Sequence, residues 1–196
     1  MNEFVNIVVC RHPETKNGHI TPTGGMQAIK LSHYLKEKGL FPERIFHSGA
    51  DRANQAAGIM AIATDPYNIS PEKNEAFHPM NHLREMVKDP KFIQEMQAKK
   101  TNLTIKQALD QYSYCALLRR KLRSALAALG DSLARRRERI AWVVSHGEFA
   151  ETAVGEKIID LVPYGIEHCD FVLYQISTEK GKIINSQYKS FSEISQ

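Results

Sequence analysis

Hydrophobic residues along the chain fall into short continuous runs separated by longer periodic segments. The continuous runs are rich in β-branched and aromatic residues, as is typical of strands buried on both faces of a sheet. The run 140–145, Ile-Ala-Trp-Val-Val-Ser, is the clearest example. We predict six strands, which occupy 5–10, 44–48, 67–69, 140–145, 171–176 and 182–190.

The segments between these runs have helical spacing. Thr21 can cap a helix that ends near Gly39, because Pro22 suits the first helical position. Leucines recur at helical intervals within 104–136, where Gly130 is a potential break. Two further helices are predicted at 50–63 and 148–161. The polar stretch 13–20 is predicted to form a loop, and 71–102 to be irregular with one or two short helices.

Alternating strands and helices predict an α/β fold with a mostly parallel central sheet flanked by helices. The length of 196 residues suits one sizeable core, so we expect a single domain over 1–196. Within it, an insertion at about 71–115 is expected to act as a lid or wall that selects the substrate.

Composition excludes several classes of protein. A net charge of +4 is far below that of a dedicated nucleic-acid binder, and the arginine clusters near 119–123 and 135–139 are predicted to be solvated helix faces. No apolar run approaches a membrane span, so no membrane partner is expected. The three cysteines include no CxxC pair and favour a reducing cytoplasm.

Candidate chemistry gathers at the carboxyl ends of the predicted strands. Arg11 and His12 follow the first strand, Ser48 the second and His146 the strand 140–145. Ligands of open α/β sheets bind at such ends. Arginine forks neutralise phosphoryl oxygens and a neutral imidazole can attack phosphorus, so the group suits phosphoryl transfer. Arg52 is a second candidate fork at the start of the next helix.

Four ordered segments resemble the histidine phosphatase superfamily, the phosphoglycerate-mutase-like proteins, whose fold is a three-layer sandwich. The segments are Arg11-His12-Pro13-Glu14-Thr15, the helix start 21–28, the segment 45–57 and Val143-Val144-Ser145-His146-Gly147. The first of these is similar to the family's Arg-His-Gly signature, and the last to its Val-Ser-His-Gly strand end.

The resemblance implies a metal-independent phosphatase, without a cofactor, that hydrolyses phosphomonoesters through a phosphohistidine intermediate. His12 would be the nucleophile, Arg11 and Arg52 would bind the phosphoryl oxygens, and His146 would stabilise the transition state. Three more residues are expected to bind the substrate, a small phosphorylated molecule or a phosphoprotein. They are Asn17, Ser48 and Gly147.

The general acid is harder to place. The resemblance implies a glutamate some way after the second arginine, and Glu75 fits best. Glu85 and Glu72 remain alternatives. The other histidines, namely His47, His78, His82 and His168, are expected to be structural or exposed, although His78 or His82 could line the substrate mouth.

Two residues depart from the family pattern. Pro13 stands where a glycine is usual and removes a backbone N–H from the phosphate loop. Glu148 replaces a second glycine after His146. Three alternatives therefore stay open: a phosphoglycerate-type mutase, a protein phosphohistidine phosphatase, and a pseudo-enzyme that binds a phosphorylated ligand with little or no turnover.

Overall fold

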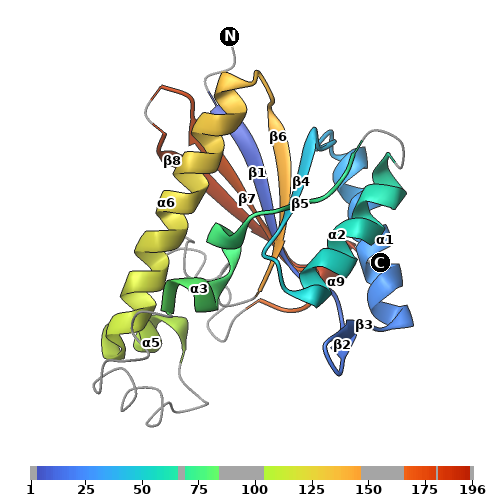
Figure 1. Cartoon of the computed structure of the whole chain (residues 1–196), viewed down its shortest axis with the longest axis horizontal. Coiled ribbons are helices and arrows are strands. Elements are labelled where there is room, and N and C mark those ends of the chain that lie inside the picture. Colours follow the sequence, from blue (N-terminus) through green and yellow to red (C-terminus); the bar gives the residue numbers. More distant parts are fainter. Residues whose placement is uncertain (1–3, 66–68, 84–103, 147–165, 180, 195–196) are drawn as a thin grey trace.

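The computed structural model describes residues 4–65, 69–83, 104–146, 166–179 and 181–194 (Figure 1). Its centre is a six-stranded sheet in the order β5-β4-β6-β1-β7-β8. These strands are β1 (Phe4–Arg11), β4 (Arg44–His47), β5 (Glu72–Lys73), β6 (Ile140–Ser145), β7 (Phe171–Ser177) and β8 (Ile183–Lys189). The first four run parallel, whereas β7 and β8 are antiparallel to their neighbours. The predicted mostly parallel α/β sheet is confirmed.

Helices cover both faces of this sheet (Figure 1). The long α6 lies on one face, and α1, α2 and the short α9 lie on the other. A 3-10 turn η1 and the short helices α3 and α5 lie beside α6. The bounds are α1 (Pro22–Glu37), α2 (Asp51–Thr64), η1 (Glu75–Phe77), α3 (Pro79–Leu83), α5 (Ile105–Gln111), α6 (Ser113–Arg135) and α9 (Phe191–Ile194).

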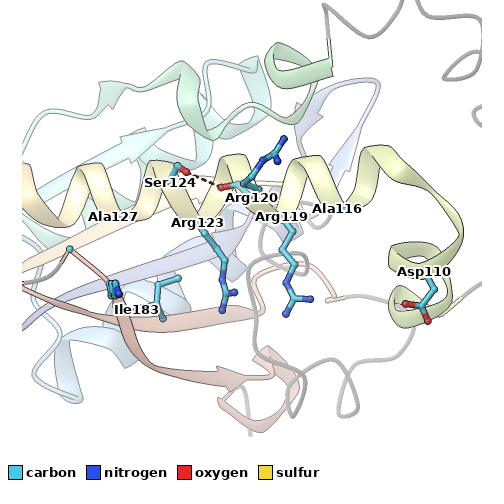
Figure 2. Close-up of a pocket in the computed structure, with 10 residues that line it drawn as sticks. Asp110, Ala116, Arg119, Arg120, Arg123, Ser124, Ala127 and Ile183 are labelled. Atoms are coloured by element: carbon cyan, nitrogen blue, oxygen red, sulfur yellow. Dashed lines mark hydrogen bonds between the residues drawn. The ribbon is translucent and has the colours of Figure 1, made fainter.

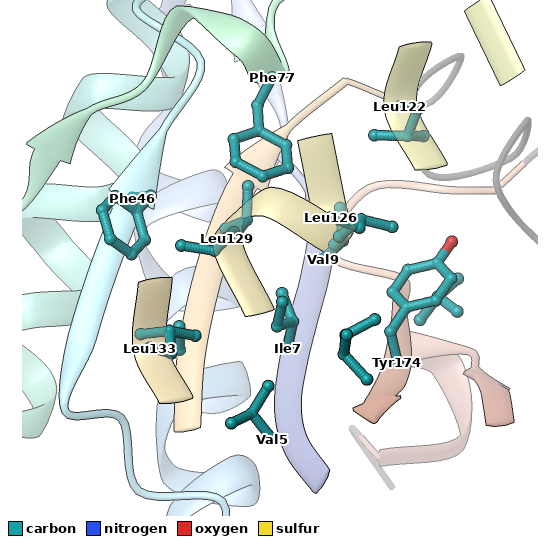
Figure 3. Packing of buried hydrophobic residues seen from close by; sticks show 14 of the residues in the cluster. Val5, Ile7, Val9, Phe46, Phe77, Leu122, Leu126, Leu129, Leu133 and Tyr174 are labelled. Carbon is teal, nitrogen blue, oxygen red and sulfur yellow. The ribbon is translucent and has the colours of Figure 1, made fainter. Parts of the chain in front are cut away.

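The central strand β1 explains why the first apolar run is continuous. Val5, Ile7 and Val9 are buried in the cluster under α6, which Figure 3 shows from close by. Val8 and Cys10 are buried in the cluster under α1 and α2. Because successive side chains of a strand point to opposite faces, a strand covered on both sides is apolar at nearly every position, and Asn6 is the exception within 5–10. The three layers hold the carboxyl ends of β1, β4 and β6 at one edge.

The structure differs from two local predictions. The loop expected at 13–20 contains a hairpin of β2 (Thr15–Lys16) and β3 (His19–Ile20). Of the strand expected at 67–69 only Ile69 is described, and it is not in a strand; a parallel strand, β5, lies inside the stretch expected to be irregular. Residues 66–68 themselves lie outside the described residues.

The remaining difference concerns the segment 104–136. It divides at Tyr112 into α5 and α6, whereas α6 runs through Gly130 without a break. A side chain at Gly130 would lie 2.6 Å from Cγ2 of Ile176 on β7, so glycine lets the helix approach the sheet closely. The helix expected at 148–161 lies outside the described residues.

Candidate active site

Three parallel strands deliver the candidate residues to one edge of the sheet. The backbone N–H of His12 donates to the carbonyl of Ser145 at 2.9 Å, and that of Ser48 donates to the carbonyl of Val144 at 3.1 Å. These bonds continue the ladders past the ends of β1 and β4 on either side of β6. As a result, His12 and Ser48 flank His146, as the positions of the strand ends predicted.

His12 is buried and its ring is held in one tautomer. Nδ1 lies 2.9 Å from the carbonyl oxygen of Pro13, which can only accept, so Nδ1 carries the proton. Burial lowers the pKa of His12 to about 4; Arg52, His168 and Arg11 act in the same direction, against the Pro13 carbonyl. At neutral pH the ring is therefore uncharged, with a lone pair on Nε2. That is the form a nucleophilic imidazole requires.

His146 stands edge-on to His12, with ring centroids 5.5 Å apart and an interplanar angle of 77°. A guanidinium nitrogen of Arg52 donates to Nδ1 of His146 at 3.1 Å. Arginine has no acceptor, so the proton of the neutral ring is on Nε2, which donates to Oγ of Ser48 at 3.2 Å. Burial, followed by Arg52, lowers the pKa of His146 to about 3. His146 thus holds the Arg52 guanidinium close to His12.

Two guanidinium groups supply the positive charge of the site. Arg11 is the last residue of β1, and one of its terminal nitrogens donates to the carbonyl of Ile166 at 2.5 Å. Arg52 is the second residue of α2, whose N-terminus adds partial positive charge. Among the described residues Nε of Arg52 is buried without a hydrogen-bond partner. Two cations beside two neutral imidazoles suit a phosphoryl group.

Cys10 is a poor rival for the role of nucleophile. Its thiol is 1% exposed, and burial raises its pKa to about 12. A thiol that stays protonated is a weak nucleophile. Cys10 is therefore a core residue, as predicted. Within the described part of the chain, no three His, Cys, Asp or Glu side chains are arranged to hold a metal ion.

A cavity lies along α6, and none of Arg11, His12, Ser48, Arg52 and His146 lines it. Figure 2 shows it along α6, where the arginine cluster near 119–123 faces residues 181–183. Its volume is about 730 Å³, and Arg119, Arg123 and Lys182 contribute to its lining. Its arginines belong largely to the exposed face of the helix, since Arg120 and Arg123 are both exposed.

Comparison with known sequences finds one distant relative. No protein-family model matches the chain. The broad-specificity phosphatase YOR283W of Saccharomyces cerevisiae is 28% identical over 79 residues. That match covers 35% of this chain, and the chain spans about a third (34%) of the length of the relative.

Comparison with solved structures covers nearly the whole chain. A phosphoglycerate mutase from Bacillus anthracis superposes with a TM-score of 0.66 at 14% identity, over 98% of this chain and 96% of the mutase. The chain has the phosphoglycerate mutase fold. This fold is shared by a phosphoserine phosphatase from Entamoeba histolytica in complex with 3-phosphoglyceric acid, with a TM-score of 0.59 at 16% identity over 94% and 96% of the two chains. The protein histidine phosphatase SixA, solved with tungstate, has a TM-score of 0.58 at 15% identity over 96% and 99%.

The phosphoglycerate mutase fold predicted from the four motifs is thus confirmed. It brings together five of the predicted site residues, namely Arg11, His12, Ser48, Arg52 and His146. Asn17 is exposed at the tip of the β2–β3 hairpin, with a φ of 54°. Gly147 lies outside the described residues.

The two described candidate acids lie on β5 and η1. Glu75 begins η1, its side chain is 60% exposed, and it forms an ion pair with Lys73. Glu72 on β5 pairs with Arg44 at 2.7 Å. Glu85 lies outside the described residues. Of the two described glutamates, Glu75 is in the turn that also leads to His78.

Two histidines expected to be structural or exposed lie against His12 and His146. The ring of His78 is 5.3 Å from that of His146, and the ring of His168 is 5.4 Å from that of His12. A sequence signal for His168 existed, because it lies three residues before Phe171, the first residue of β7. Since β7 is antiparallel to β1, its first residue, Phe171, pairs with Cys10 near the end of β1. Residues before an antiparallel strand therefore reach the same edge.

Proposed function

We propose that this protein is a histidine phosphatase that hydrolyses phosphomonoesters through a phosphohistidine on His12. The observation that carries the proposal is the hydrogen-bonding state of His12. Its Nδ1–H is bound to the Pro13 carbonyl, and the low pKa leaves the Nε2 lone pair available. Arg11 and Arg52 lie close enough to His12 to lower its pKa, so they suit the binding of the phosphoryl oxygens.

The reaction follows in two steps. Nε2 of His12 attacks phosphorus, the bond from phosphorus to the leaving oxygen breaks, and that oxygen takes a proton from a general acid. Water then attacks the phosphohistidine, the bond between phosphorus and Nε2 breaks, and its electron pair returns to His12. The acid, now a base, accepts the proton of the water. His146 can bind a phosphoryl oxygen when its Nε2–H turns from Ser48.

We propose Glu75 as the acid. Glu75 begins η1, and His78, which follows this turn, has its ring against that of His146. Its effect should depend on the leaving group. Glu75→Gln is expected to slow an alkyl phosphate more than an aryl phosphate that leaves without protonation. An equal effect on both substrates would exclude Glu75.

The substrate is proposed to be a small phosphorylated molecule. The Entamoeba protein of this fold was solved with 3-phosphoglyceric acid, and the yeast relative is a broad-specificity phosphatase. A protein phosphohistidine is a second candidate, favoured by the likeness to SixA over 99% of that chain. A cytoplasmic location suits three buried cysteines with no CxxC pair among them. No helix in the described part of the chain is long and apolar enough to span a membrane.

Turnover of an aryl phosphate in the presence of a chelator tests the proposal. Wild-type protein should be active, and His12→Ala should lower kcat by about three orders of magnitude or more. His33→Ala is the matched control, because His33 is exposed on α1. Equal turnover by wild type and His12→Ala, or loss of turnover with the chelator, would contradict a metal-independent histidine phosphatase. A mutase would instead return the phosphoryl group to an added hydroxy acid.

A further inference from the structure

His168 contacts the backbone of the nucleophile. Its Nδ1 lies 3.0 Å from the carbonyl oxygen of His12. A carbonyl only accepts, so Nδ1–H of His168 is the donor. The two rings are adjacent, with centroids 5.4 Å apart and an interplanar angle of 46°. His168 therefore bonds to the peptide that joins His12 to Pro13.

That peptide has one hydrogen-bonding group instead of two. Proline has no N–H, so only the carbonyl of His12 can hold the peptide plane by a hydrogen bond. The next carbonyl, that of Pro13, receives Nδ1–H of His12. A rotation of the His12–Pro13 peptide would displace this acceptor and turn the imidazole away. The bond from His168 therefore bears on the direction of the Nε2 lone pair.

His168 is itself held by a turn with a buried carboxylate. Asp170 is 1% exposed, and its two oxygens accept three hydrogen bonds. They come from the backbone N–H of Glu167 at 2.8 Å, the hydroxyl of Tyr188 at 2.6 Å and the backbone N–H of Phe191 at 2.7 Å. The backbone N–H of Cys169 also donates to the carbonyl of Arg11 at 3.3 Å.

These contacts tie the turn to β1 on one side and to the carboxyl-terminal strand β8 and helix α9 on the other. His168 lies between Glu167 and Cys169, so both of its neighbours are fixed. A side chain on such a support can hold its hydrogen bond in one geometry.

We propose that His168 is a positioning residue: it fixes the His12–Pro13 peptide in place of the N–H that Pro13 lacks, and so aims the nucleophile. The proposal rests on the function proposed for His12. It assigns His168 no contact with the substrate and no transfer of a proton.

The test compares two amide variants of the same residue. In His168→Asn the side-chain nitrogen can occupy the place of Nδ1, whereas in His168→Gln it reaches only the place of Nε2. Single-turnover phosphorylation of His12 by an aryl phosphate is measured, together with KM and the thermal unfolding midpoint. His168→Gln should slow phosphorylation by about tenfold to a hundredfold, the range expected for a misplaced reacting group. His168→Asn should retain a rate within about threefold of wild type, and KM should change little in either.

Three results would overturn the proposal. Both variants could phosphorylate at the wild-type rate, which would show that the contact is irrelevant. Both could be slowed equally while their unfolding midpoints match wild type, which would indicate that His168 acts through its ring chemistry. A rise in KM with an unchanged rate would assign His168 to substrate binding. If wild-type protein forms no phosphohistidine on His12, the function itself fails, which is a separate outcome.

Discussion

At the scale of the residue, the two ring nitrogens of His12 have different tasks. Nδ1 is occupied by the Pro13 carbonyl, which leaves the Nε2 lone pair for the attack on phosphorus that we propose. His146 is paired at both nitrogens, with Ser48 and Arg52. The identity of these residues could be predicted from their positions after apolar strands. Their protonation could not, because it depends on burial and on partners far away in sequence.

The low pKa values make stability depend on pH. The ordinary histidine value is 6.5, and burial lowers the pKa of His12 to about 4 and of His146 to about 3. Below pH 6.5 these two histidines therefore bind protons in the unfolded chain, whereas in the folded chain they stay neutral down to their lowered pKa values. The stability associated with each neutral ring is complete above pH 6.5 and is lost as the pH falls toward the folded-state value.

We expect each ring to contribute up to about 2 kcal/mol to the loss of stability between pH 7 and pH 5. Urea unfolding of wild type and His146→Gln at both pH values measures this contribution. The loss should be smaller in the variant. An identical loss in both proteins would show that His146 is not kept neutral by the fold.

At the scale of the element, the loop that follows β1 is anchored by the start of α1. The backbone N–H of Thr21 donates to the carbonyl of Glu14 at 3.2 Å, and the Thr21 hydroxyl caps the helix at Gly24. The cap could be predicted from Thr21 and Pro22. The hairpin before it was missed, although Asn17 and Gly18 form an Asn-Gly turn of the kind that favours hairpins.

Gly24 and Gly25 provide a matched pair of variants. A Cβ at Gly24 would lie 2.2 Å from the carbonyl oxygen of Glu14, whereas the nearest atom to one at Gly25 is 4.0 Å away. Gly24→Ala should therefore lower the free energy of unfolding by about 1–3 kcal/mol and reduce turnover by displacing the loop. Gly25→Ala should raise stability by up to about 1 kcal/mol, because alanine favours a helix. Equal effects in denaturant unfolding would refute the contact.

At the scale of the whole molecule, one sheet is shared by two cores. The apolar runs and their alternation with helices were sufficient to predict the α/β class. They could not give the direction of β7, because hydrophobic pattern does not distinguish parallel from antiparallel pairing. That direction brings residues 166–170, and His168 with them, to the catalytic edge.

The two faces should unfold together. Leu126 and Leu31 are fully buried on opposite faces of the sheet, whereas Ile62 on α2 is 70% exposed. Leu126→Ala and Leu31→Ala should each lower the free energy of unfolding by about 2–5 kcal/mol. Ile62→Ala, the control, should change it by less than about 0.5 kcal/mol. Calorimetry should show a single transition for all three, and two separate transitions would contradict a shared core.

Trapping the phosphohistidine that we propose on His12 tests the proposed function. Protein mixed with an aryl phosphate is quenched in alkali within one turnover, digested, and mapped by mass spectrometry. We predict a phosphoryl group on His12 that is stable in alkali and labile in acid, and that is absent from His12→Ala. Turnover with no phosphoryl group on His12, or with one on another residue, would contradict the account.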